Sequence, residues 1–174
     1  RASIITVVAR SGGPFARMGH DHAIAARNIS GFAEPGKGRA DFSFRVDEMT
    51  VGQPEVRTLA GLPGTVPADA IAGTRANMLG RVLEADRFPL VQLRAEQPGG
   101  AAGTMRLAVT LHGVTRSIDV PAVLDVTPAG LAAAGRFRLR QTDFGIKPMS
   151  VLGGALVVQD EMELSFRIHA SRVR

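Results

Sequence analysis

Apolar and polar residues alternate along this chain with a period of two. Residues 39–46 read RADFSFRV, which places Ala40, Phe42, Phe44 and Val46 on one face and charged or hydroxyl side chains on the other. Such alternation is typical of a β-strand that buries one face. The same pattern returns in residues 91–95, 105–111, 118–126, 131–139 and 162–168. We therefore predict an antiparallel sheet with one solvated face.

The remaining segments complete a predicted barrel. Residues 4–8 and 20–26 are expected to be extended, which gives a sheet of about eight strands. Because an open sheet of this size exposes its edge strands, we predict an all-β fold in which the sheet closes into an antiparallel β-barrel. Apolar residues change to near-helical spacing after Val66, and we predict a small helical insertion near residues 55–83. One domain is expected over residues 1–174.

The inward faces of these strands suggest a binding interior. A barrel of about eight strands encloses room for its own side chains or for one ligand. The chain has 8 Phe and no Trp or Tyr, so its lining is expected to be aliphatic and phenylic. We expect a long apolar ligand to contact Phe42, Phe44, Leu107, Val109, Leu111, Phe137, Leu139, Leu164 and Phe166. An interior filled by its own side chains, acting only as an interaction module, remains the alternative.

Composition and missing motifs exclude several classes of function. The net charge is +5, but the basic residues are spread along the chain among acids, so we do not expect nucleic-acid binding. The chain has no Cys, which excludes disulfides, thiolate metal sites and cysteine nucleophiles. No apolar run is long enough for a membrane span. Since the common nucleophile, phosphate-binding and zinc-protease motifs are missing, we predict a protein that is not an enzyme.

Two histidines form the strongest candidate for a polar site. His20 and His22 are two residues apart, so both rings would project from the same face of an extended strand and could chelate one divalent metal. A third ligand would have to come from elsewhere in the fold. The alternatives are a metal-binding protein or metal-dependent enzyme, a polar head-group anchor, and a turn in which the histidines bond the backbone.

Three segments resemble conserved stretches of the YceI-like family. They are LEADRFPLVQLRAE at residues 83–96, VTLHGVTRSIDVP at 109–121 and LRQTDFGI at 139–146. The resemblance implies a lipocalin-like barrel with an elongated apolar tunnel that holds a polyisoprenoid or another long amphiphile, such as a quinone. It also implies an exported bacterial protein, periplasmic or secreted. No signal peptide is recognisable within residues 1–174.

The resemblance also marks candidate head-group contacts and one departure. Arg75, Arg116 and Arg140 lie beside family-like elements and would suit a phosphate or a quinone oxygen at the tunnel mouth. Surface ion pairing is the alternative for all three. The GHDH sequence at residues 19–22 differs from the usual family pattern. The function expected is that of a non-catalytic carrier of a long-chain isoprenoid or other lipid, and a homodimer is compatible with the sequence.

Overall fold

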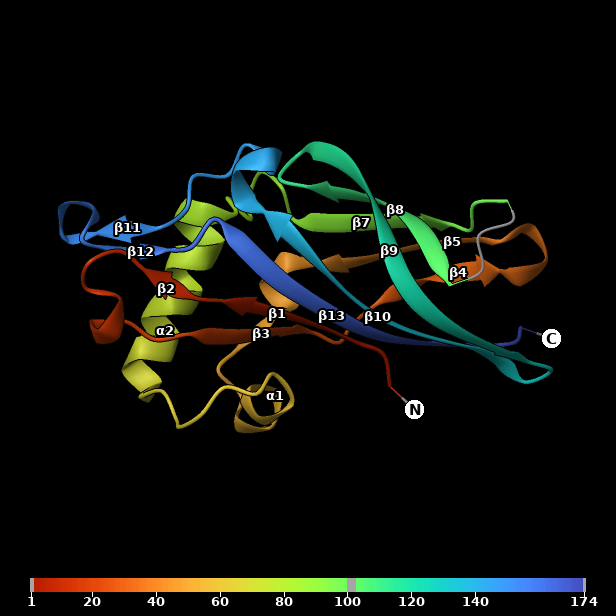
Figure 1. Cartoon of the computed structure of the whole chain (residues 1–174), viewed down its shortest axis with the longest axis horizontal. Coiled ribbons are helices and arrows are strands. Elements are labelled where there is room, and N and C mark those ends of the chain that lie inside the picture. Colours follow the sequence, from red (N-terminus) through yellow and green to blue (C-terminus); the bar gives the residue numbers. More distant parts are fainter. Residues whose placement is uncertain (1, 100–102, 174) are drawn as a thin grey trace.

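A computed structural model describes residues 2–99 and 103–173 of the chain. Its main feature is a ten-stranded antiparallel sheet with the strand order β4-β5-β7-β8-β9-β10-β13-β1-β3-β6, which curls into a half-barrel (Figure 1). The strands are β1 (Ile4–Ala9), β3 (His22–Ala26), β4 (Ser30–Glu34), β5 (Arg39–Arg45), β6 (Thr50–Val51), β7 (Leu90–Glu96), β8 (Thr104–Leu111), β9 (Val114–Thr127), β10 (Gly130–Arg140) and β13 (Glu161–Ser171). The predicted all-β antiparallel fold is confirmed.

The sheet differs from the prediction in its number of strands and in how far it closes. Eight of the ten strands coincide with predicted segments, and the two that do not are β4 and β6. These two stand at opposite ends of the strand order, and the described residues contain no pairing between them. Among the described residues, no pair of strands therefore closes the curl between β4 and β6.

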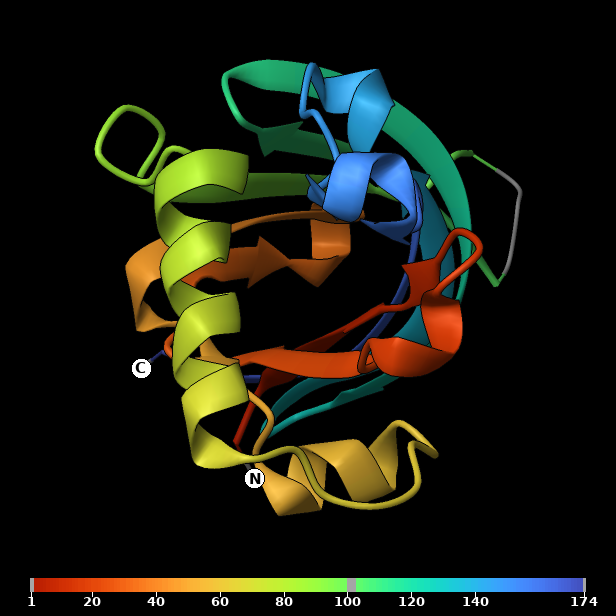
Figure 2. The ribbon, with the colours of Figure 1, turned by 90° about the vertical axis from the view of Figure 1, so that its left-hand side faces the viewer.

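Helical segments occupy the region where an insertion was predicted. Helix α1 spans Pro54–Leu59 and α2 spans Ala68–Asn77, followed by a π-helical turn at Met78–Val82. Pro54 opens α1 at a position where its missing N–H costs no hydrogen bond. Helix α2 runs across the end of the curled sheet at which β3 begins (Figure 2). We call this end of the barrel the α2 end.

A second, small sheet extends the molecule at the α2 end. It consists of β2 (Ser11–Gly12), β12 (Leu156–Val158) and β11 (Ser150–Val151), with β12 in the middle. Two short 3₁₀ helices, η1 (Ala16–Met18) and η6 (Leu152–Gly154), adjoin it. The opposite end carries the β4–β5 and β9–β10 hairpins (Figure 1), and we call it the hairpin end. Three other 3₁₀ turns are η2 (Pro35–Lys37), η3 (Val46–Glu48) and η5 (Gln141–Phe144).

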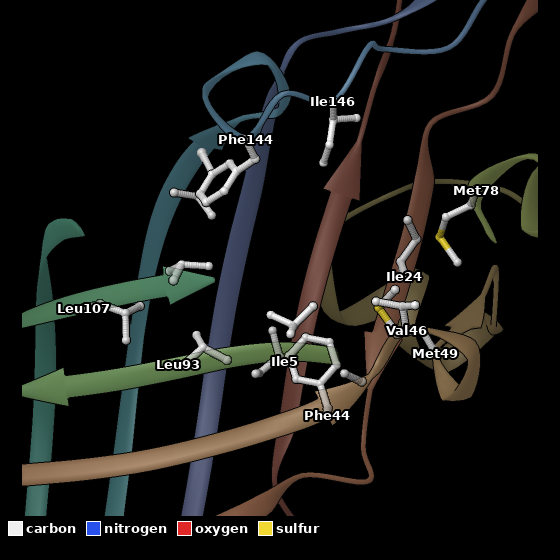
Figure 3. Packing of buried hydrophobic residues seen from close by; sticks show 14 of the residues in the cluster. Ile5, Ile24, Phe44, Val46, Met49, Met78, Leu93, Leu107, Phe144 and Ile146 are labelled. Atoms are coloured by element: carbon white, nitrogen blue, oxygen red, sulfur yellow. The ribbon is translucent and has the colours of Figure 1, made fainter. Parts of the chain in front are cut away.

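Apolar side chains cover both faces of the sheet near β1 and β3. The larger cluster lies inside the curl and includes Ile5, Phe44, Leu93 and Leu107, all turned toward one interior (Figure 3). A smaller cluster lies on the outer face, where Val56 of α1 packs with other buried residues. Its members are Val8, Ala23, Ala25, Val56 and Leu62. Helix α1 thus covers an outer surface that would otherwise be apolar and exposed.

Candidate functional site: an apolar cavity inside the curled sheet

The curled sheet encloses a cavity of about 970 Å³. Successive strands contribute every second residue to its lining, as β7 does with Val91, Leu93 and Ala95. This follows from the pleat, since alternate side chains of a strand point to the same face. Aliphatic, Phe and Met side chains dominate the lining. Known small-molecule pockets measure about 300–1,000 Å³, so this cavity is large for its class.

The residues predicted to contact a long apolar ligand all line this cavity. They are Phe42 and Phe44 of β5, Leu107, Val109 and Leu111 of β8, Phe137 and Leu139 of β10, and Leu164 and Phe166 of β13. The interior is therefore incompletely filled by its own side chains. The alternative of a solidly packed interaction module does not agree with this geometry.

The cavity has a more exposed and a more sheltered end. At the hairpin end, Phe32 and Val126 belong to the lining and are each more than half exposed to solvent. At the α2 end the lining residues Met78, Gln141 and Ile146 are buried. Phe144 is wholly buried beside them and lies near Ile146 at the same end of the cluster (Figure 3). The cavity lining is therefore more exposed to solvent at the hairpin end than at the α2 end.

A small polar group lies at the α2 end of the lining. His22 opens β3, and its Nε2 lies 3.3 Å from Oγ1 of Thr74 on α2. Asn77, one helical turn further along α2, also lines the cavity. The Nδ1 atom of His22 is buried and has no hydrogen-bond partner among the described residues. Burial lowers the pKa of His22, and the nearby His20 and Arg57 lower it further, against an opposing effect of Asp21.

Asp21 fixes the GHDH segment through hydrogen bonds with Arg10 and Ser11. Asp21 accepts hydrogen bonds from Nη1 of Arg10 at 3.2 Å and from the backbone N–H of Ser11 at 2.9 Å. His20 is exposed, and its ring centroid lies 6.3 Å from that of His22. Across residues 2–99 and 103–173, no three His, Cys, Asp or Glu side chains are grouped so as to hold a metal. The metal hypothesis therefore gains no third ligand from the fold.

The buried side chain of Arg57 connects α1 to the backbone directly before β3. Arg57 donates from Nη1 to the carbonyl oxygen of Asp21 at 2.6 Å and from Nη2 to that of Pro63 at 2.9 Å. Its Nε donates to the carbonyl oxygen of Gly64 at 3.2 Å. These carbonyls satisfy a charged group that is costly to bury without partners.

The three predicted head-group arginines lie outside the cavity lining. Arg75 donates to the carbonyl oxygen of Asp47, Arg140 lies 3.6 Å from a carboxylate oxygen of Asp143, and Arg116 is exposed on β9. Among residues 2–99 and 103–173, the charged side chains that do line the cavity are Arg39 and Arg172. Both stand at the hairpin end, at a strand terminus, where sequence alone gives no signal of the opening.

The three family-like segments meet at His112. Its Nε2 lies 2.6 Å from Oε2 of Glu84, and its Nδ1 lies 3.2 Å from the carbonyl oxygen of Phe144. The ring also packs on Phe88, with the centroids 4.5 Å apart. Arg87, which donates to Glu84 at 2.7 Å, and then His112 hold the pKa of that carboxyl below its ordinary value. The sequence pattern gives no signal of this contact, because His112 and Glu84 are 28 residues apart.

The fold and the cavity define a curled antiparallel half-barrel with an apolar interior. The family model of the YceI-like domain matches residues 20–170. The chain therefore belongs to the YceI-like family, as its three motifs predicted. A comparison with curated proteins finds no match.

Solved structures with the same fold cover nearly the whole chain. A polyisoprenoid-binding domain from Saccharophagus degradans, implicated in plant cell wall breakdown, aligns with a TM-score of 0.65 at 11% identity, over 98% of this chain and 94% of that one. Burkholderia cenocepacia BcnA aligns with a TM-score of 0.60 at 14% identity, over 97% and 96%. The YceI protein of Campylobacter jejuni aligns with a TM-score of 0.55 at 13% identity, over 84% and 82%. At these identities the likeness establishes the fold alone.

Proposed function

We propose that this protein is a non-catalytic carrier that holds one long apolar molecule, such as an isoprenoid lipid or the tail of a quinone, inside the curled sheet. The observation that carries the proposal is the apolar cavity of about 970 Å³. Membership of the YceI-like family and the fold shared with a polyisoprenoid-binding domain support a lipid as the cargo.

Physical chemistry supports retention of such a cargo without specific polar contacts. Each methylene removed from water contributes about 0.8 kcal/mol, so a long chain accumulates a large favourable free energy. Phe42, Phe137 and Phe166 present broad apolar surfaces from three different strands of the lining. In this account the length and width of the cavity, rather than a hydrogen-bonding pattern, select the ligand.

The proposal also accounts for the few charged groups around the cavity. Arg39 and Arg172 line the hairpin end, where an incoming amphiphile would first meet the protein. The interior that follows has an uncharged lining among the described residues. An apolar chain would therefore occupy the interior, with any ionised end close to the opening.

A pair of matched tryptophan variants tests the proposal. Val109 is buried in the lining of the cavity, and Gln92 lies on the neighbouring strand β7 with its side chain exposed. Val109→Trp fills part of the cavity, so we expect it to reduce the amount of lipid co-purified or taken up by about tenfold while the thermal midpoint changes little. Gln92→Trp is expected to retain the lipid at the parent level.

The readout is quantified lipid extracted from equal amounts of each purified protein, with circular dichroism melting in parallel. If Val109→Trp loses stability and lipid in equal measure, or if it binds as much lipid as Gln92→Trp, the cavity is not the binding site.

A further inference from the structure

Four exposed apolar side chains gather at the tip of the α2 end. Phe15, Met18, Val151 and Leu152 are 48%, 69%, 40% and 61% exposed. Phe15 and Met18 lie at η1, while Val151 and Leu152 lie at β11 and η6. The backbone N–H of Phe15 bonds the carbonyl oxygen of Ala155 at 2.8 Å, and that of Ala155 bonds the carbonyl oxygen of Leu152 at 3.2 Å. These bonds join the two segments into one surface, which we call the apolar tip.

Leu152 adopts a backbone conformation that is costly for a leucine. Leu152 has a φ of 53°, in the left-handed region where Gly or Asn is more stable than a bulky residue. Its side chain is also largely exposed, so it gains little from burial. Folding alone would therefore favour another residue at this turn. A leucine that is costly for the turn and exposed to solvent suits a contact outside the chain.

The charges around the apolar tip are of one sign. Residues 11–20 and 144–159, which form the tip and its supports, contain Arg17, Lys147 and His20 but no Asp or Glu. Arg17 and Lys147 are both exposed. Three acids border these ranges, and each has a partner: Asp21 is engaged by Arg10, Asp143 lies 3.6 Å from Arg140, and Asp160 accepts bonds from Thr142. Exposed apolar side chains flanked by basic ones, with acids missing, match the surface of an anionic bilayer.

We propose that the apolar tip is a docking surface for anionic lipid bilayers. Phe15, Met18 and Leu152 enter the boundary between head groups and acyl chains, and Arg17 and Lys147 contact the anionic head groups. The tip lies at one extreme of the long axis, and both of its segments face the viewer in Figure 2. Docking by the tip therefore leaves the hairpin end, where the cavity lining is more exposed, pointing away from the bilayer.

The lack of cysteine in the chain allows a direct test. Leu152→Cys carries an environment-sensitive fluorophore at the tip, and Val123→Cys, at a 75% exposed position on β9 toward the hairpin end, carries the same label as a matched control. With vesicles of phosphatidylglycerol and phosphatidylcholine in equal parts, we expect a blue shift of emission at position 152 and none at position 123. Phosphatidylcholine vesicles alone are expected to give a weaker shift at position 152.

A second set of unlabelled variants separates the apolar and the charged contributions. The combination of Phe15→Ser, Met18→Ser and Leu152→Ser is expected to lower the fraction sedimenting with the mixed vesicles at least tenfold, while Val123→Ser together with Leu59→Ser, at exposed apolar positions outside the tip, leaves it unchanged. Arg17→Ser and Lys147→Ser are each expected to weaken binding about fivefold at low salt.

Three results would overturn the docking proposal. They are an unshifted emission at position 152, equal sedimentation of the parent and the triple serine variant, and equal binding to vesicles with and without phosphatidylglycerol. Lipid retention in the cavity is measured separately, and the tip variants leave the cavity lining intact. Failure of docking is thus distinguishable from failure of the carrier function.

Discussion

His112 holds together segments that are far apart in the sequence. It has a φ of 53° and is followed by Gly113 at 72°, the positive values that a tight two-residue hairpin turn between β8 and β9 requires. From this turn its ring reaches Glu84 and the carbonyl oxygen of the buried Phe144. The contact with Glu84 spans 28 residues, so the turn also anchors the chain that leaves the helical insertion.

Replacing His112 is expected to cost stability through the loss of these bonds. His112→Ala removes the hydrogen bonds to Glu84 and to the carbonyl oxygen of Phe144, and it places alanine in the left-handed region, so we expect the free energy of unfolding to fall by about 2–3 kcal/mol. His112→Asn tolerates the turn but does not reach Glu84, and we expect about half that loss. Urea unfolding followed by circular dichroism checks this, since the chain has no Trp or Tyr. Equal stability of His112→Ala and the parent would refute the anchoring role.

Asp160 gives the fold a specific dependence on acid. Its carboxylate accepts bonds from the hydroxyl of Thr142 at 2.6 Å and from the backbone N–H of Thr142 at 2.9 Å. The hydroxyl bond is the main reason that the pKa of Asp160 lies below its ordinary value of 3.8. The ionised form is therefore favoured in the folded state.

The sign of the pH effect follows from this lowered pKa. The stability contributed by Asp160 is fully present above pH 3.8 and is lost as the pH falls through the lower pKa of the folded state. We expect Asp160→Asn to be less stable than the parent at neutral pH and to approach it under strongly acidic conditions. Urea midpoints measured across this range check the expectation. A difference between the two proteins that does not change with pH would contradict it.

At the scale of elements, α1 packs on the outer face of the curled sheet and contributes no residue to the cavity lining. Val56 is 1% exposed within the outer cluster, whereas Leu59 on the same helix is 54% exposed. We expect Val56→Ala to lower the free energy of unfolding by about 2 kcal/mol, and Leu59→Ala to change it by less than about 0.5 kcal/mol. Both variants should retain the bound lipid per folded molecule. Thermal melts together with lipid extraction measure these effects, and lipid loss specific to folded Val56→Ala would contradict the separation.

The long strands were predictable from sequence because each shows sustained alternation. Strand β4, with the sequence SGFAE, has largely exposed side chains and no such alternation, and β6 has only two residues. The three strands of the small sheet are equally short, and pairing between distant segments creates them. Short strands of this kind depend on tertiary contacts that local patterns do not contain.

The sequence predicted the lining of the candidate site but not the residues at its opening. The nine expected lining residues follow directly from the alternation, and all of them face the cavity. The arginines that reach its opening do not follow, because the curl and register of the sheet decide which strand ends surround that opening. For the same reason the sequence did not reveal the approach of Glu84 to His112. The apolar tip was missed because η1 and η6 are short and carry no periodic signal.

At the scale of the whole molecule, the half-barrel encloses one apolar cavity, and different elements surround its two ends. The strands supply the apolar lining, α2 and η5 shelter one end, and the hairpins surround the other (Figures 1 and 2). No described helix is both long and apolar enough to cross a bilayer.

Native mass spectrometry of untagged protein, purified without added ligand and then incubated with a long-chain isoprenoid alcohol, tests this account most directly. We predict a complex with one bound lipid per chain, whose extra mass is removed by extraction into organic solvent and is much reduced in Val109→Trp. A protein that shows only its bare chain mass after incubation would contradict the carrier function. A complex that forms equally well with Val109→Trp would contradict the assignment of the cavity.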